Sequence, residues 1–292
     1  MPRVQTFDHC GFMVQDIPRA HKFYGQLFGA KPLWMANLNL NVYSGWPIIS
    51  FVDMGAHRFE LCLAMKPLPA ADPAYPLPRI GFSLSAAALE ALERRLDELE
   101  IPHEPAKAGA NGLPIDQTLQ VRDPDGNLLD MSVMRDGREG PPPSNGVIPL
   151  TDLSHIVLEV TDLDVAERFY TQVLGLEVIQ RDGGDLGNGR LALANATGQL
   201  LLLEKVPELS PRSRFRGPDA STAPDPEGYC GAHLAMTLSS LEEYDEMYAA
   251  LRAWGVQSDG DIRKGERPST EKSDYFYDPA GNRIQLVASA KP

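Results

Sequence analysis

Hydrophobic and polar residues follow two kinds of spacing along this chain. Residues 7–14 alternate as a half-buried strand does, and residues 17–28 carry apolar residues at helical spacing. The apolar positions of the second stretch are Ile17, Ala20, Phe23, Tyr24 and Leu27. A strand followed by an amphipathic helix is therefore predicted near the start of the chain.

The same two spacings predict the remaining elements. A helix is expected from Ala86 to Leu99, with Ser85 as its cap, because a hydroxyl group can accept a free backbone N–H at a helix start. Two further helices are expected at residues 163–174 and 240–254. Strands are expected at residues 39–52, 58–65, 80–85, 117–122, 127–134, 154–160, 189–195, 199–205, 232–238, 272–277 and 283–288.

The chain also repeats itself. The segment from His9 to Asp16 matches the segment from His155 to Asp162, and a Phe-Tyr pair and a later glycine follow both at the same spacing. Asp-Pro-Asp-Gly-Asn at residues 123–127 likewise matches Asp-Pro-Ala-Gly-Asn at residues 278–282. So many matched positions indicate two copies of one half.

A stretch rich in proline and glycine, residues 137–149, separates the halves and reads as a linker. We predict an N-terminal domain at residues 1–136 and a C-terminal domain at residues 150–292, each with two β-α-β-β-β units. The predicted fold class is α+β, with four βαβββ modules paired into two open β-barrel domains and helices outside. The segment from Pro207 to Gly228, rich in Pro, Ser and Asp, is expected to be a mobile loop over one face.

Composition narrows the class of protein. The 292 residues include 40 acidic and 27 basic side chains, a formal net charge of −13, so neither nucleic acid nor an anionic membrane surface is an expected partner. The sequence shows no secretory signal, no apolar run of roughly 20 residues that could span a bilayer, and too few cysteines for a disulfide framework. We therefore expect a cytoplasmic protein that acts on a small molecule. Its oligomeric state is left open, a homo-oligomer included.

Four units in two tandem pairs resemble the vicinal oxygen chelate superfamily of glyoxalase I, methylmalonyl-CoA epimerase, bleomycin- and fosfomycin-resistance proteins, and extradiol ring-cleaving dioxygenases. The resemblance rests on the first-strand His followed by Asp, the Phe-Tyr pair, the later Leu-Gly, and the closing Asp-Pro-x-Gly-Asn turn. The layout is most similar to extradiol dioxygenases of the catechol 2,3-dioxygenase type. That similarity implies that the two units of each half curl into one barrel, and that the C-terminal barrel alone holds iron.

The resemblance implies His155, His233 and Gln285 as metal ligands, with Gln285 where the family has Glu. Two imidazoles and one carboxylate leave three open coordination positions, which suits Fe(II) binding a catecholate and O₂ together. Tyr275 matches a position that contacts substrate in the family.

The catalytic histidines of the family have no counterpart in this chain. The position of one of them corresponds to Glu266 and Arg267. Glu266 is therefore a candidate for proton transfer and Arg267 a candidate for substrate binding, and Tyr275 is a candidate for both roles.

A second set of candidate ligands lies in the N-terminal half. His9, Glu60 and Asp130 occupy ligand positions of the superfamily and could hold a hard divalent ion such as Mn(II) or Mg(II). Some relatives instead pair unit one with unit four, which would bring together His9, Glu60, His233 and Gln285 as a glyoxalase-like set. Both arrangements are left open.

The leading functional prediction is a divalent-metal enzyme, an extradiol-dioxygenase-like oxidoreductase for a small, oxygen-rich aromatic substrate. Fe(II) is the expected metal, with Mn(II), Ni(II), Co(II) and Zn(II) as alternatives. The second hypothesis is a non-oxidative isomerase or lyase in which Glu60 is both ligand and base. The third is a metal-free protein that binds a small molecule such as an antibiotic, which the missing histidines favour.

Overall fold

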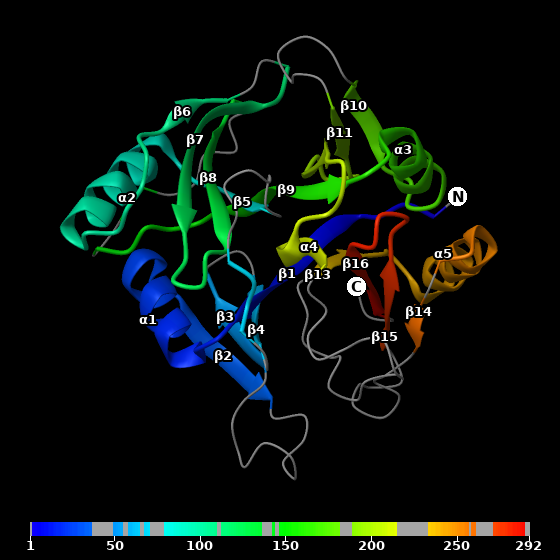
Figure 1. Ribbon diagram of the computed structural model, residues 1–292, viewed down its shortest axis with the longest axis horizontal. Helices are drawn as coiled ribbons and strands as arrows, with labels where there is room; N and C mark the ends of the chain where they lie inside the picture. The colour runs from blue at the N-terminus through cyan, green and yellow to red at the C-terminus, as the bar shows by residue number, and fades with distance from the viewer. Residues whose placement is uncertain are drawn as a thin grey trace.

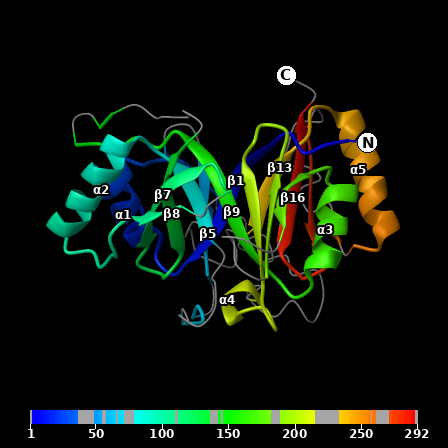
Figure 2. The same cartoon turned by 90° about the horizontal axis from the view of Figure 1, so that it is seen from above.

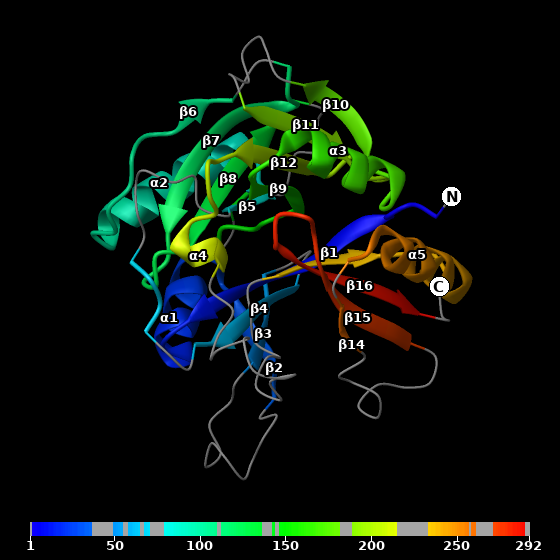
Figure 3. The same ribbon diagram turned by 45° about the vertical axis from the view of Figure 1, so that its right-hand side comes forward.

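Two eight-stranded sheets with helices outside them form the structure of this chain, a computed structural model (Figure 1). It describes residues 2–36, 49–54, 58–64, 67–70, 79–109, 112–135, 142–143, 146–181, 189–214, 233–256, 258–260 and 271–289. Each sheet curls into a half-barrel (Figure 3), and the α+β fold class expected from the sequence is confirmed. Most of the expected linker at residues 137–149 lies outside the described residues.

Each sheet joins strands from both halves of the chain. Sheet I has the order β14 (Ser258–Gly260), β15 (Glu271–Tyr277), β16 (Arg283–Ser289), β13 (His233–Thr237), β1 (Thr6–Val14), β4 (Arg58–Leu63), β3 (Ile49–Asp53) and β2 (Lys31–Ala36). Sheet II has the order β10 (Glu177–Arg181), β11 (Arg190–Ala194), β12 (Leu200–Lys205), β9 (Asp152–Val160), β5 (Arg79–Ser83), β8 (Leu128–Met134), β7 (Ile115–Arg122) and β6 (Lys107–Ala108). Unit one therefore pairs with unit four, and unit two with unit three.

This pairing corrects one expectation and confirms another. The expectation that the two units of one half share a barrel is wrong, because β1 hydrogen-bonds to β13 and β5 hydrogen-bonds to β9. The alternative pairing of unit one with unit four is confirmed. The two sequence halves, residues 1–136 and 150–292, repeat one another along the chain, but each sheet contains strands from both halves.

Within the described residues, four longer helices cover the ends of the molecule. Figure 2 shows α1 (Ile17–Phe28) and α2 (Ala86–Glu98) at one end, and α3 (Leu163–Gln172) and α5 (Leu241–Trp254) at the other. The predicted cap is confirmed, since Ser85 Oγ accepts a hydrogen bond from the backbone N–H of Ala88. Among the described residues, no helix has the length and apolar character needed to cross a membrane.

The repeated motifs hold the fold together. Tyr24 Oη donates to Asp123 at 3.0 Å, and Asn127 Nδ2 donates to the carbonyl oxygen of Met13 at 2.9 Å, so the closing turn is tied to both the helix and the first strand. The second half repeats these bonds with Tyr170 to Asp278 at 2.8 Å and Asn282 to the carbonyl of Glu159 at 2.9 Å. The Phe-Tyr pair and the Asp-Pro-x-Gly-Asn turn therefore explain the architecture and leave the chemistry to other residues.

The segment expected to be a loop begins with a short helix, α4 (Pro211–Arg214), which lies to one side of the central strands (Figure 2). Glu159 accepts hydrogen bonds from the backbone N–H of Ser210 at 2.8 Å and from Ser213 Oγ at 2.6 Å. These bonds anchor the start of the segment, so the expectation of a loop is wrong there. Residues 215–228 lie outside the described residues.

Candidate metal centre

Three buried side chains with metal-ligating atoms meet on one face of sheet I. They are His9 on β1, Glu60 on β4 and His233 on β13, and their ligand atoms all lie within 4.8 Å of one another. The meeting follows from the register, because Gly11 pairs with Glu60 on one side and with His233 on the other. Among the described residues this is the one group of three such side chains.

This face is the one turned away from helix α1. Phe59 packs against Tyr24 of α1 with ring centroids 4.7 Å apart. Because side chains alternate along a strand, the next residue, Glu60, points to the opposite side of the sheet. We call this side, which bears His9, Glu60 and His233, the ligand face.

The three ligand atoms are close enough to share one cation or one proton. His233 Nε2 lies 3.2 Å from both Glu60 Oε2 and His9 Nε2, and His9 Nε2 lies 3.5 Å from Glu60 Oε2. Burial by itself lowers the pKa of His9, but the carboxylates of Asp8 and Glu60 outweigh burial and raise that pKa to about 9. Burial is the main reason that the pKa of His233 is lowered. Without a metal, His9 is therefore the more basic of the two imidazoles.

The donor set fits a divalent cation. Glu60 Oε1 is buried and has no hydrogen-bond partner, and a buried carboxylate is costly unless a cation compensates its charge. Burial raises the pKa of Glu60, but His233 and His9 lower it well below its usual range, so the carboxylate stays ionised. Two imidazoles and one carboxylate are ligands that suit Fe(II), Mn(II), Co(II), Ni(II) or Zn(II).

A bulge in β1 brings a fourth residue to the site. The pairing of β1 with β13 shifts register between Phe7 and His9, and Asp8 Oδ2 lies 2.6 Å from His9 Nδ1. Engaging Nδ1 in this way leaves Nε2 of His9 for a metal, as a carboxylate commonly does for a metal-bound histidine. Asp8 therefore orients His9.

Gln285 shares the ligand face. It pairs with Ala235, two residues after His233, so its side chain lies on the same side of the sheet as His233. Gln285 Nε2 donates to Ser273 Oγ at 2.8 Å, and Gln285 Oε1 is buried without a hydrogen-bond partner. The amide oxygen is therefore a candidate fourth ligand.

Aromatic rings extend the site on both sides of the histidines. The ring of Phe51 lies 5.7 Å from His9, and the ring of Tyr275 lies 5.3 Å from His233, both edge-on. The guanidinium of Arg283 lies 4.1 Å above the ring of Tyr275. The ligand face thus carries a row from Phe51 through the two histidines to Tyr275 and Arg283.

Sheet II contains the equivalent place with different chemistry. Gly81 pairs with Asp130 in sheet II, just as Ala235 pairs with Gln285 in sheet I. Arg79 lies two residues before Gly81, and His233 lies two residues before Ala235, so Arg79 occupies the position equivalent to His233. A Cβ on Gly81 would lie 2.2 Å from the ring of His155, so glycine leaves the space that this ring fills.

A guanidinium takes the place of a metal in sheet II. Arg79 Nε contacts Asp130 at 3.1 Å, Arg79 Nη2 contacts Glu204 at 2.9 Å, and His155 Nε2 lies 3.1 Å from Asp130. Burial raises the pKa of Asp130, but His155 and Arg79 outweigh it and lower that pKa below its usual value. The carboxylates that could hold an ion in sheet II are already compensated.

These placements divide the ligand sets expected from the sequence. The set His155, His233 and Gln285 is not brought together, because His155 belongs to sheet II and the other two to sheet I. The set His9, Glu60 and Asp130 loses Asp130 to sheet II for the same reason. The set that meets on one face is His9, Glu60 and His233, with Gln285 on the same side of the sheet.

The other expected site residues have mixed outcomes. Tyr275, which was expected to contact substrate, lies beside His233. Glu266 and Arg267 lie outside the described residues. Sequence reasoning missed Asp8 and Arg283. A carboxylate next to a candidate ligand, and an arginine inside an apolar strand, were the available signals.

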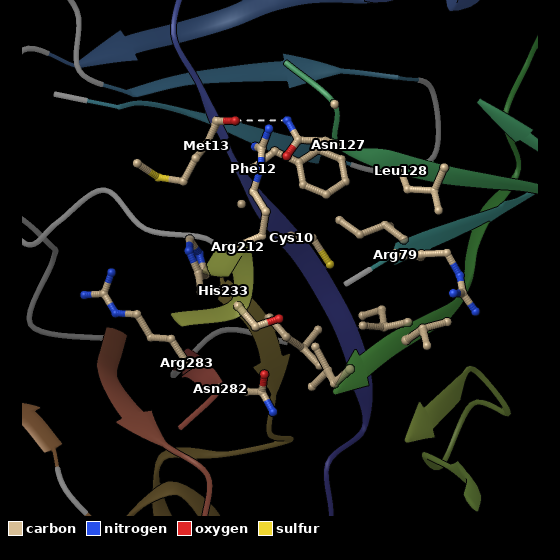
Figure 4. Close-up of a pocket in the computed structure, with 18 of the residues that line it drawn as sticks. Cys10, Phe12, Met13, Arg79, Asn127, Leu128, Arg212, His233, Asn282 and Arg283 are labelled. Atoms are coloured by element: carbon tan, nitrogen blue, oxygen red, sulfur yellow. Dashed lines mark hydrogen bonds between the residues drawn. The ribbon is translucent and has the colours of Figure 1, made fainter. Parts of the chain in front are cut away.

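A pocket lies along the seam between the sheets (Figure 4). Apolar side chains of the central strands line much of it, among them Phe12, Ile80, Leu158 and Leu234. His233 lines the pocket from sheet I, and Arg79, at the equivalent position, lines it from sheet II. Figure 4 shows Arg283 and Arg79 extending away from the pocket in opposite directions, so the two sites face away from each other.

Comparison with known proteins agrees with this architecture. A putative dioxygenase from Bacillus subtilis subsp. subtilis str. 168 has a TM-score of 0.68 at 14% identity, covering 100% of this chain and 87% of its own. Glyoxalase I from Zea mays has a TM-score of 0.60 at 17% identity, covering 99% of this chain and 92% of its own. At such identities these structures show the fold alone. The family model Glyoxalase/Bleomycin resistance protein/Dioxygenase superfamily matches residues 6–131 and 152–286, so the chain belongs to that superfamily.

Proposed function

We propose that this protein is a divalent-metal-dependent enzyme that binds two neighbouring oxygen atoms of a small substrate on the ligand face of sheet I. The observation that carries the proposal is the convergence of His9, Glu60 and His233, whose buried ligand atoms lie within 4.8 Å of one another. A divalent ion held there would act as a Lewis acid toward the substrate oxygens. Membership of a superfamily that includes dioxygenases and glyoxalases supports the proposal.

The surroundings of the ligands favour a flat, aromatic substrate. Phe51 and Tyr275 stand on either side of the two histidines, and aromatic rings pack well against other rings. The ligands themselves are buried, which excludes water and strengthens electrostatic interactions with the substrate. Asp8 holds the orientation of His9.

Among reactions of such a site, we infer extradiol-type ring cleavage with Fe(II) as the leading candidate. Two histidines and one carboxylate are the ligand set typical of non-haem Fe(II) oxygenases, and the set here is His9, His233 and Glu60. Ring cleavage also needs a group that accepts a phenol proton. Tyr275 is a described neighbour of the ligands, and Glu266 remains proposed for that role from the sequence, with Arg267 proposed to bind the substrate.

The test compares the two copies of the site. Protein purified and loaded with Fe(II) under reducing conditions is assayed for bound iron and for a yellow ring-fission product from catechols. We expect His9→Ala to lose both, whereas the matched variant His155→Ala, altered at the equivalent residue of sheet II, keeps both. Iron retained by His9→Ala but lost from His155→Ala would overturn the assignment of the site, and absence of iron from the unaltered protein would overturn the function.

A non-oxidative isomerase or lyase is the second candidate, and Gln285 is the observation that favours it. If Gln285 Oε1 serves as a fourth ligand, two coordination positions of an octahedral ion remain, enough for two substrate oxygens but not for O₂ as well. Glu60 would then also act as the base beside a carbonyl. Turnover without O₂ that Glu60→Gln abolishes, with the fold intact, would favour this reaction over ring cleavage.

A further inference from the structure

We propose that a cavity in sheet II is a second binding site, and that its ligand is a small neutral amide, with an N–H donor beside a C=O acceptor on a compact apolar body. We call this the sheet II cavity, and the lining residues that matter here are Arg79, Leu113, Ile115, Asp130, Leu202 and Glu204. The inference does not depend on the function proposed for the metal centre, because that centre lies in sheet I.

The duplicated scaffold has replaced two of the three metal-ligating residues in sheet II. Leu202 pairs with Val157 of β9, just as Glu60 pairs with Gly11 of β1, and these partners lie at matching positions of the repeat. Arg79 stands where sheet I has its second histidine. An apolar side chain and a guanidinium therefore replace a carboxylate and an imidazole, which leaves a cavity suited to an organic ligand.

The sheet II cavity is large enough for a small molecule. Its volume is about 160 Å³, and one ordered water needs about 10–15 Å³ of such space, so about ten non-hydrogen atoms fit. Leu113, Ile115 and Leu202 line it and belong to one cluster of packed apolar side chains. Ala108 is exposed and Arg190 is half-exposed where they line the cavity, so it opens to solvent there.

The charges that line the sheet II cavity balance one another. Glu204 Oε1 lies 2.9 Å from Arg79 Nη2 and 3.1 Å from Arg190 Nη2. Asp130 lies 3.1 Å from Arg79 Nε, so two carboxylates face two guanidinium groups. A charged ligand would enter with a charge that nothing compensates, which is costly away from water. The cavity therefore favours a neutral ligand.

The central ion pair leaves a donor and an acceptor side by side. Among the described residues, Arg79 bonds through Nε and Nη2, and Glu204 is contacted at Oε1, so Arg79 Nη1 and Glu204 Oε2 remain for a ligand. Both atoms flank the same 2.9 Å contact, because the terminal nitrogens share one carbon and the carboxylate oxygens share another. An amide is complementary, since its N–H can donate to Glu204 while its C=O accepts from Arg79.

The experiment measures binding of three related compounds to the full chain by isothermal titration, with a chelator present so that the metal centre is empty. Benzamide has both the N–H and the C=O, methyl benzoate lacks the N–H, and benzoate carries a negative charge. We expect benzamide to bind with a Kd of about 0.1–1 mM, and the ester and the anion to bind at least about 10-fold more weakly.

Three variants test whether the compound lies in the sheet II cavity. Glu204→Gln removes one negative charge, so the preference for benzamide over benzoate should fall about 10-fold or more. Glu60→Gln, the same substitution on the ligand face of sheet I, should keep the preference of the unaltered protein. Ala108→Phe places a ring at the exposed opening and should weaken benzamide binding about 10-fold or more, which keeps the test decisive if Glu204→Gln fails to fold.

Several results would overturn the inference. Absence of saturable benzamide binding would do so, as would equal affinity for the ester, because the polar groups of the cavity would then play no part. Tighter binding of benzoate by the unaltered protein would indicate an anion site instead. A preference that Glu204→Gln leaves unchanged, or benzamide binding that Glu60→Gln abolishes and Ala108→Phe does not affect, would place the ligand elsewhere.

Discussion

Protonation of His9 should make the stability of the metal-free protein depend on pH. Folding raises the pKa of His9 from 6.5 to about 9. At about 1.4 kcal/mol for each pKa unit, this difference corresponds to about 3 kcal/mol in the free energy of unfolding. Because the pKa is higher in the folded state, the contribution is complete below about pH 6.5 and is lost as the pH rises through about 9.

Urea unfolding in the presence of a chelator measures this contribution. The free energy of unfolding is compared between the unaltered protein and His9→Gln, a variant that keeps a polar side chain but does not titrate. We expect the difference between them to shrink by about 3 kcal/mol between about pH 6 and about pH 10. Glu60→Gln removes one of the carboxylates that raise the pKa of His9. In that variant, the loss of stability contributed by His9 should therefore occur at lower pH.

The groups that face His9 make this prediction refutable. Asp8 and Glu60 supply the negative charge, while His233 lies 3.2 Å away and competes for the same proton. A stability difference between the unaltered protein and His9→Gln that stays constant over this pH range would show that His9 does not hold the proton. If the stability contributed by His9 is lost at the same pH in Glu60→Gln as in the unaltered protein, Glu60 does not raise the pKa of His9.

Three further predictions concern the two copies of the site. Asp8→Asn should weaken metal binding about 10–100-fold by releasing the orientation of His9, whereas the equivalent change Ser154→Ala should leave the affinity measured by chelator competition unchanged. Arg79→Leu should lower the free energy of unfolding by about 3–5 kcal/mol, because it leaves two buried carboxylates uncompensated, and a loss under about 1 kcal/mol in urea titration would contradict the ion-pair assignment. Gln285→Glu should tighten metal binding by adding a negative ligand, and an unchanged metal dissociation constant would show that Gln285 is not a ligand.

The two sheets show how one duplicated scaffold supports two kinds of charge compensation. In sheet I a carboxylate lies between two imidazoles, whereas in sheet II Arg79 supplies a fixed cation to Asp130 and Glu204. Either a guanidinium or a divalent ion can compensate a buried carboxylate, and in sheet II Arg79 already does so for Asp130 and Glu204. Within the described residues we therefore expect one metal ion per chain.

Local patterns in the sequence determined most of the secondary structure. The helix expected at residues 17–28 matches α1, and Ser85 caps α2 as expected, because helical spacing and capping depend on neighbouring residues. The strands that sequence reasoning missed are the four edge strands, namely β2, β6, β10 and β14. An edge strand has few buried positions, as the mostly exposed residues of β10 show, so it carries little of the alternation that reveals a strand.

The sequence by itself also revealed the repeat, the superfamily resemblance and every residue of the proposed ligand set. Only the tertiary structure decided which of these residues meet. Strands pair through backbone hydrogen bonds, which do not depend on side-chain identity. The pattern of strands therefore allows unit one to pair with unit two or with unit four. His9 and His155 look alike in the sequence because each begins a copy of the same strand. Their chemistry differs because the neighbouring strands bring Glu60 and His233 to His9, but Asp130 and Arg79 to His155.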